Sequence, residues 1–194
     1  MCSSDLPPRT LLQRFEIGLV VVPTQNTTWK SAVKALLALR ETGELTPDRI
    51  LAIDEGQLQE LIRPARYPVS KSRYLREMAA FFREYPFRKQ GPPDRKTLLA
   101  IPGIGPESAD SLLLYAFGQP CFIADAYGRR ILAALGLVPE TAGYEPVREW
   151  AEGALPRDSA LLGELHALLV AHGTRFYSRR PYGEGDTLLE PLSR

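Results

Sequence analysis

This sequence of 194 residues contains few cysteines and no long hydrophobic run. Its two cysteines, Cys2 and Cys121, exclude a disulfide scaffold and any iron–sulfur cluster held by this chain alone. The longest apolar run, residues 17–22, is far shorter than the roughly 20 residues that span a bilayer. The first residues also lack the charged and apolar regions of a signal peptide. We therefore expect a cytoplasmic protein with no membrane partner.

An excess of charge of one sign is also missing. Lysine and arginine number 24 against 23 acidic residues, so the net charge of +1 does not by itself predict a polyanionic partner. The basic residues are grouped instead. Such a group is usually a solvated surface, yet a local patch can bind phosphate when the whole chain is nearly neutral. The groups are Arg63 to Arg76, Arg129 with Arg130, and Arg175 to Arg180.

Apolar residues recur at helical spacing along most of the chain. Because 44% of the residues are apolar, these helices can bury a sizeable core. The run Val20–Val22 would also suit a strand, and the residues after Gly173 predict a mostly irregular tail. The pattern predicts a compact all-α protein. The predicted helices cover residues 11–22, 29–39, 47–53, 56–62, 70–85, 92–100, 106–117, 126–135, 145–155 and 159–171.

A turn rich in glycine joins two of these helices. The turn, "PGIGP" at residues 102–106, contains Gly103, Ile104 and Gly105. Glycine allows a positive φ and leaves backbone N–H groups uncovered, so such a turn can bind an anion without reading base sequence. The alternative is an ordinary tight turn between two packed helices, which a pair of glycines alone does not exclude.

The same stretch carries a family resemblance. "IPGIGPESA" at residues 101–109 resembles the helix-hairpin-helix signature of the endonuclease III superfamily of DNA glycosylases, often called HhH-GPD. "PTQNTTW" at residues 23–29 is similar to the polar turn after that family's first barrel helix. Gln25 then stands where a family residue fills the gap in opened DNA. Among the family's branches, the chain looks closest to the 3-methyladenine glycosylases that lack an iron–sulfur cluster.

Two further segments extend the resemblance over nearly the whole chain. "FIADAYGRRILAALG" at residues 122–136 resembles the segment that carries the family's catalytic aspartate. Asp125 lies twenty residues after Gly105, as that alignment requires. His172 and Gly173 match the turn that leads to the cluster cysteines in cluster-bearing members.

The resemblance implies a two-lobed fold. Residues 7–120 would form a six-helix, barrel-like domain with the helix-hairpin-helix at about residues 93–117. Residues 121–194, together with residues 1–6, would form a second helical domain without the iron–sulfur cluster loop.

Two departures from the family pattern bear on the chemistry. Bifunctional members carry a lysine two residues after the second glycine as a Schiff-base nucleophile. Glu107 stands at that position here, and a carboxylate cannot form an imine. The cluster cysteines after Gly173 are missing as well. The resemblance therefore implies a glycosylase without AP lyase activity, without an iron–sulfur cluster and without a bound metal.

The resemblance assigns roles to residues that also have simpler explanations. Asp125 would stabilise the positive charge that develops on the sugar and orient water, but an aspartate there also suits a helix N-cap. Trp29 would stack on the flipped base, or else pack in the core. Gln25 would fill the gap in DNA or cap the next helix. Arg129 would contact phosphate beyond the turn formed by Gly103, Ile104 and Gly105.

Together these inferences predict a base excision repair enzyme. It would bind double-stranded DNA as a monomer, take a damaged base out of the stack and hydrolyse its N-glycosidic bond with the help of Asp125. An alkylated purine is the expected base, and the nucleoid the expected location if the organism is a prokaryote. Two alternatives stay open. One is an endonuclease III-like glycosylase and AP lyase for oxidised or abasic DNA that uses Lys30 or Lys71. The other is a helix-hairpin-helix protein that binds DNA structures without catalysis.

Overall fold

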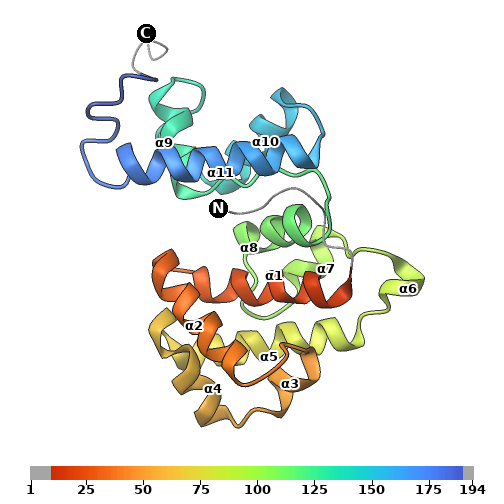
Figure 1. Cartoon of the computed structure of the whole chain (residues 1–194). Coiled ribbons are helices and arrows are strands. Elements are labelled where there is room, and N and C mark those ends of the chain that lie inside the picture. Colours follow the sequence, from red (N-terminus) through yellow and green to blue (C-terminus); the bar gives the residue numbers. More distant parts are fainter. Residues whose placement is uncertain (1–9, 190–194) are drawn as a thin grey trace. The chain divides into compact units, whose positions relative to one another are not determined.

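A computed structural model describes residues 10–189, and these residues form helices joined by turns (Figure 1). Within this range no strand occurs, so the all-α prediction is confirmed and the strand alternative for Val20–Val22 is wrong. The parts of the predicted domains at residues 1–9 and 190–194 lie outside the described residues.

The described chain divides into two compact units, residues 10–117 and residues 118–189, here called the hairpin unit and the C-terminal unit. The hairpin unit contains α1 (Leu11–Thr24), α2 (Trp29–Glu41), α3 (Pro47–Ala52), α4 (Glu55–Ile62), the 3-10 helix η1 (Arg63–Ala65), α5 (Pro68–Glu84), α6 (Phe87–Gln90), α7 (Arg95–Leu99), α8 (Pro106–Ser111) and the π-helix η2 (Leu112–Ala116). The C-terminal unit contains α9 (Ala126–Ala134), α10 (Tyr144–Ala154) and α11 (Ser159–Phe176).

Helix α1 is the central helix of the hairpin unit. It packs against α2, α5, α8 and η2, and Figure 1 shows it (red) between α8 and α5. Phe15, Leu19 and Val22 of α1 are fully buried. The ring of Phe15 lies 5.3 Å from that of Phe82 on α5, a separation at which aromatic rings attract each other. This burial explains why α1 has apolar residues on nearly all sides.

Side-chain caps set the beginning of most helices. Thr46 accepts a hydrogen bond from the N–H of Arg49, with Pro47 at the first helical position and Asp48 in the first turn of α3, as the sequence predicted. These caps occupy backbone N–H groups that a helix end otherwise leaves without an acceptor. The other side-chain caps are Thr10, Thr28, Asp54, Asp94, Asp125 and Asp158.

The structure differs from the predicted helices at two points that matter for the site. Helix α1 continues through Pro23 to Thr24, because a proline in the last turn removes little bonding and the Thr24 hydroxyl donates to the carbonyl groups of Val20 and Val21. The helix expected over residues 106–117 changes to π geometry after Ser111, where the N–H of Phe117 donates to the carbonyl of Leu112. In addition, η1 and α6 were not predicted.

A buried ion pair holds the two helices of the hairpin together. Arg95 at the start of α7 donates to both carboxylate oxygens of Asp110 on α8, at 2.7 and 3.1 Å. Asp110 is fully buried, and two parallel hydrogen bonds of this kind fix orientation as well as distance. The α7–α8 pair is therefore a rigid support for the turn between its helices.

In the C-terminal unit, α9 packs against α11 and the chain after α11 folds back on a buried carboxylate. A Cβ at Gly173 of α11 would overlap Tyr127 of α9, so the two helices approach closely there. Asp186, 2% exposed, accepts hydrogen bonds from His172 Nε2 at 2.7 Å and from the Tyr177 hydroxyl at 3.2 Å. The N–H groups of Leu188 and Leu189 also donate to it.

The buried carboxylate of Asp186 should make the C-terminal unit sensitive to acid. Burial raises the pKa of Asp186, but the hydrogen bond from His172 and the backbone N–H groups outweigh burial and lower it below its usual value. A carboxyl whose pKa is lower in the folded state adds stability above about pH 4 and loses it below. We expect the melting temperature of the wild type to fall more steeply between about pH 5 and pH 3 than that of Asp186→Asn. Parallel curves in thermal melts over this range would contradict the prediction.

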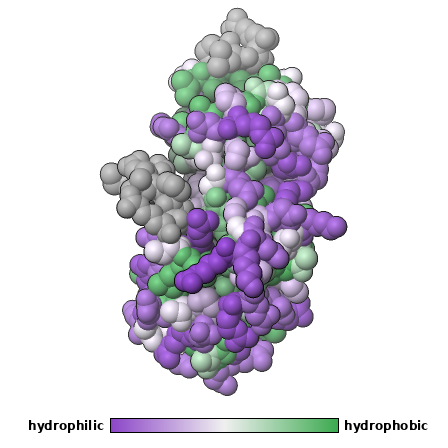
Figure 2. All heavy atoms as spheres, turned by 90° about the vertical axis from the view of Figure 1, so that its right-hand side faces the viewer, coloured by the Kyte–Doolittle hydropathy of each residue, from purple (hydrophilic) through white to green (hydrophobic). Residues whose placement is uncertain are grey.

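Hydrophilic residues dominate the face shown in Figure 2, where hydrophobic residues lie in small separate patches. Among the described helices, none combines the length and the apolar character needed to cross a membrane.

Candidate nucleic-acid interface and active site

Gly103 and Gly105 leave two backbone donors open at the turn between α7 and α8. The N–H of Ile104 donates to the carbonyl of Ile101 at 3.0 Å, and the Ile104 side chain is buried. Within residues 10–189, the N–H groups of Gly103 and Gly105 have no acceptor. Of the three predicted hairpin residues, the two glycines therefore hold the donors that an anion can reach.

The two glycines have different reasons to be glycine. Gly103 has a φ of 86°, which favours glycine, and a Cβ there would overlap the ring of Tyr74 on α5. Gly105 has a φ of −88°, which any residue adopts, and no atom lies within 4 Å of the place its Cβ would occupy. The fold therefore requires glycine at residue 103 but not at residue 105, where the missing side chain leaves room beside a free N–H.

Gln25 connects the turn after α1 to the hairpin. Its side-chain Nε2 donates to the carbonyl of Gly103 and to the hydroxyl of Ser108, both at 3.0 Å. The cap of α2 is Thr28, which accepts from the N–H of Ser31. The structure thus overturns the alternative in which Gln25 caps the next helix, and places its amide against the hairpin.

Exposed aromatic side chains stand at the start of two helices in the hairpin unit. Trp29 begins α2 and is 60% exposed, so the alternative that it packs in the core is wrong. Tyr67, which sequence analysis did not single out, precedes α5 and is 62% exposed with a φ of 50°. A positive φ is uncommon for a residue with a side chain and is maintained only where the surroundings hold it. No sequence pattern distinguishes Tyr67 from an ordinary turn residue.

Lys71, one of the two lysines considered as a nucleophile, is buried and fully bonded. Its Nζ donates to the carbonyl groups of Pro23, Gln25 and Ala65 at 2.9, 2.7 and 2.6 Å. An ammonium group has three N–H donors, so none remains for a substrate. Lys30 is exposed on the first turn of α2 and lacks this restraint.

Asp125 is buried at the N-terminus of α9 in the C-terminal unit. Its Oδ1 accepts a hydrogen bond from the N–H of Gly128 at 2.6 Å, so the predicted N-cap is present. In the described part of the chain, Gly128 is the only donor bonded to this side chain, which leaves Oδ2 available. The cap holds the carboxylate in one orientation without using both of its oxygens.

His166 on α11 lies within the electrostatic influence of the same carboxylate and was missed in the sequence. Gly128 on α9 lies close to both Asp125 and α11: a Cβ built there would be 3.1 Å from Asp125 Oδ1 and 3.6 Å from the side chain of Leu169. Leu169 follows His166 by about one turn of α11, so the two side chains lie on the same side of that helix. Burial lowers the pKa of the His166 imidazole, and the negative charge of Asp125 offsets part of this shift. The ring is therefore neutral at pH 7.

The basic residues after Asp125 are engaged within the C-terminal unit. Arg129 donates to the carbonyl of Ala124 at 2.7 Å and is half-buried. Its neighbour Arg130 donates to the carbonyl of Tyr177 at 2.8 Å and lies 4.6 Å from the ring centre of Tyr182. Both arginines thus support the local fold, and the contact of Arg129 with phosphate stays a prediction.

Comparison with known proteins identifies the family. A model of the HhH-GPD superfamily of base excision DNA repair proteins matches residues 19–157. The chain belongs to this superfamily. It is 36% identical over 175 residues to a protein of Methanocaldococcus jannaschii named "Putative DNA repair glycosylase MJ1434", covering 86% of this chain and 80% of the relative. It is 35% identical over 171 residues to endonuclease III of Sulfolobus acidocaldarius, covering 86% and 76%.

Two solved structures share the fold. A non-covalent endonuclease III–DNA complex matches with a TM-score of 0.80 at 22% identity, over 93% of this chain and 83% of that one. The 3-methyladenine DNA glycosylase MagIII of H. pylori, bound to 1,N6-ethenoadenine, matches with a TM-score of 0.73 at 24% identity, over 87% of both chains.

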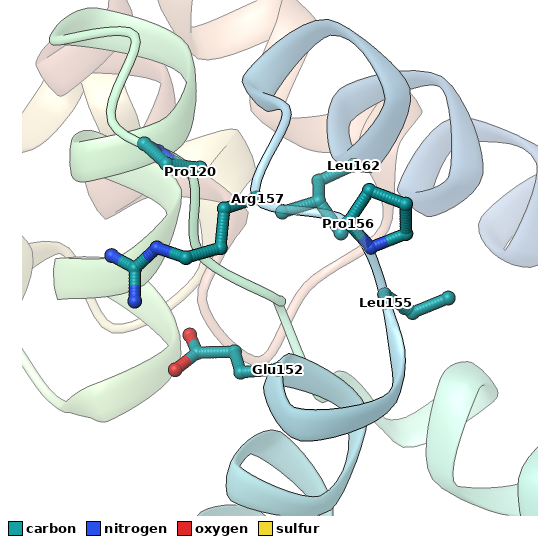
Figure 3. Close-up of a pocket in the computed structure, with 6 residues that line it drawn as sticks. All are labelled: Pro120, Glu152, Leu155, Pro156, Arg157 and Leu162. Carbon is teal, nitrogen blue, oxygen red and sulfur yellow. The ribbon is translucent and has the colours of Figure 1, made fainter.

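The HhH-GPD chain has a further recess in its C-terminal unit, shown in Figure 3. Glu152 at its edge accepts hydrogen bonds from the N–H of Phe122 and from Arg148, so it holds the segment before Asp125 against α10. Residues 10–189 contain no cluster of three or more His, Cys, Asp or Glu side chains suited to a metal ion. The recess is lined by Pro120, Glu152, Leu155, Pro156, Arg157 and Leu162, none of which was a predicted site residue.

Proposed function

We propose that this HhH-GPD protein is a monofunctional DNA glycosylase that hydrolyses the N-glycosidic bond of a damaged base in duplex DNA. The proposal rests mainly on Gly105. The fold would accept a side chain at this position, yet the residue is glycine, and its backbone N–H has no acceptor within the described residues. A phosphate that approaches the backbone closely accounts for glycine at this position. The proposal includes no iron–sulfur cluster, because a cluster of the usual kind needs four cysteines and this sequence has two.

Asp125 supplies the chemistry in this proposal. Cleavage of the bond between base and sugar develops positive charge on the sugar ring. The Asp125 carboxylate, held through Oδ1 by Gly128, stabilises that charge, while Oδ2 accepts a hydrogen bond from the attacking water.

The hairpin unit binds the duplex and the extruded base in this proposal. The N–H groups of Gly103 and Gly105 bind a phosphate, and Gln25 at the edge of the hairpin fills the space that the base leaves. Trp29 and Tyr67 offer exposed aromatic faces on which bases stack. An alkylated purine carries positive charge, which an indole face attracts by about 1–2 kcal/mol. We therefore propose alkylated purines as the substrate class.

A panel of duplexes tests the function. Each duplex contains one lesion: 3-methyladenine, 7-methylguanine, 1,N6-ethenoadenine, hypoxanthine, uracil, thymine glycol or an abasic site. We expect the wild-type chain to release alkylated purines and to leave thymine glycol in place. If every base stays attached while duplex binding persists, the chain is a DNA-binding module without catalysis.

Because Glu107 replaces the lysine of bifunctional members, residue 107 offers no amine to form an imine, and we expect borohydride to trap no covalent adduct between the wild-type chain and abasic DNA. Glu107→Lys is the positive control, and we expect it to produce a trapped band on a denaturing gel. A wild-type adduct that disappears in Lys30→Ala would instead support the endonuclease III-like alternative, since Lys30 is exposed and Lys71 is not.

A further inference from the structure

Lys71 on α5 bonds the end of α1 and the end of η1 at one buried point of the hairpin unit. The residue is 3% exposed, and its ammonium donates to two carbonyl groups at the end of α1, those of Pro23 and Gln25. The third acceptor is the carbonyl of Ala65 at the end of η1. Every N–H of the ammonium group is thus used to hold the main chain.

The positive charge of Lys71 stabilises the carbonyl groups around it. The carbonyl ends of α1 and η1 converge on it, and the last turn of α1 has no basic residue of its own. Burial lowers the pKa of Lys71, and the neighbouring Arg66 guanidinium lowers it further. An apolar side chain at this buried position would avoid that cost but would leave three carbonyl groups without a donor.

The segments that Lys71 holds are followed by residues with an unfavourable backbone. Asn26, directly after Gln25, has a φ of 51°. Arg66 and Tyr67, directly after Ala65, have φ values of 64° and 50°. A left-handed backbone is unfavourable for residues with a side chain and is maintained only where neighbouring contacts hold it. The Lys71 bonds to Gln25 and Ala65 are such contacts.

Gln25 is therefore held in two independent ways. Its carbonyl is bonded to Lys71, and its side-chain amide is bonded to Gly103 and Ser108 of the hairpin. A side chain that enters DNA must release the two hairpin bonds. The bond from Lys71 to the carbonyl can remain while that happens.

We propose that Lys71 is a positioning residue for Gln25. It keeps the backbone of the α1–α2 turn in place when the Gln25 side chain leaves its hydrogen bonds with the hairpin and enters the gap in opened DNA. This inference rests on the proposed function, in which Gln25 fills that gap. A group that is already held in its bound position loses less freedom on binding, so the effect appears as affinity for opened DNA.

Binding to two duplexes of one sequence tests the inference. One duplex is intact and the other contains a single tetrahydrofuran abasic-site analogue. Dissociation constants from fluorescence anisotropy give the preference of each variant for the opened duplex. We expect Lys71→Met to lower this preference about tenfold and to leave affinity for the intact duplex nearly unchanged. Lys71→Gln, which keeps an N–H donor, serves if Lys71→Met does not fold.

Arg76 provides a matched control on the same helix. Its guanidinium donates to the carbonyl groups of Leu51 and Ile53 at the end of α3, so it holds main chain much as Lys71 does. Its acceptors belong neither to the Gln25 turn nor to the hairpin. We expect Arg76→Met to lower thermal stability while keeping the preference for the opened duplex.

A double-mutant cycle separates positioning from a general loss of stability. If Lys71 acts through Gln25, Lys71→Met lowers the preference no further in a Gln25→Ala background. Additive losses, or a preference that survives in both Lys71 variants, would overturn the inference and leave the proposed function untouched. A wild-type chain that binds both duplexes equally would contradict the gap-filling role of Gln25 and the inference with it.

Discussion

Asp125→Asn is expected to lower the rate of base release by about 100- to 10,000-fold, the usual contribution of a carboxylate that handles a proton or opposes developing charge. Asparagine keeps an oxygen that can accept the hydrogen bond from Gly128, and it is as good an N-cap as aspartate. The loss of the negative charge at the helix N-terminus should therefore lower folding stability by only about 1 kcal/mol or less. The measurement is single-turnover base release on the best substrate of the lesion panel, with a thermal melt of the same sample.

Asp158→Asn is the matched control for this variant. Asp158 caps α11 in the same unit by accepting from the N–H groups of Ala160 and Leu161, so the two variants make the same chemical change at a helix start. We expect Asp158→Asn to keep the wild-type rate. Base release that survives Asp125→Asn unchanged would reduce Asp125 to a cap and remove it from the mechanism.

The second large effect is expected at Gly103. Gly103→Ala places a Cβ into the ring of Tyr74 and forces alanine to a φ of 86°. Overpacking costs about 1–3 kcal/mol and a left-handed backbone about 1–2 kcal/mol, so we expect a loss of about 3 kcal/mol in the free energy of unfolding. Denaturant unfolding of the variant measures this loss.

Two further variants separate the steric cost at Gly103 from the phosphate-binding role of the hairpin. In a Tyr74→Ala background the overlap disappears, so the cost of Gly103→Ala should fall to its backbone component of about 1–2 kcal/mol. Gly105→Ala meets no atom within 4 Å and should fold normally, yet weaken DNA binding by separating phosphate from the backbone N–H. Equal DNA affinity of Gly105→Ala and wild type would remove the hairpin from the phosphate-binding role.

Sequence and structure agree where local chemistry decides. Helical spacing predicted the all-α fold, and the Thr46–Pro47–Asp48 start of α3 and the Asp125 cap of α9 occur as expected. Caps depend on residues within three or four positions of each other, so a sequence displays them directly. The π-helix after Ser111 was missed, because a widened turn depends on how the residues around it pack.

The burial of Lys71 could be recognised in the sequence only in part. The buried positions of α5 include Leu75, Met78 and Phe82, and Lys71 belongs to this same helical stripe. A lysine on an apolar stripe signals a buried cation with partners, but the partners lie up to 48 residues away. Sequence analysis placed Lys71 in the basic group Arg63 to Arg76 and expected a solvated surface there, so its burial was missed. Only the folded chain showed that the ammonium is unavailable as a nucleophile.

The sequence by itself determined the helical fold, the hairpin turn, glutamate in place of the hairpin lysine, and an aspartate at the start of α9, because each depends on local periodicity or on one residue type at one position. The tertiary structure decided which side chains are accessible. In the folded chain Trp29 is exposed, and the Gln25 side chain is hydrogen-bonded to a hairpin residue 78 positions away. His166 lies within the electrostatic influence of Asp125. Such contacts join residues far apart in the chain, and close packing rather than local preference selects them.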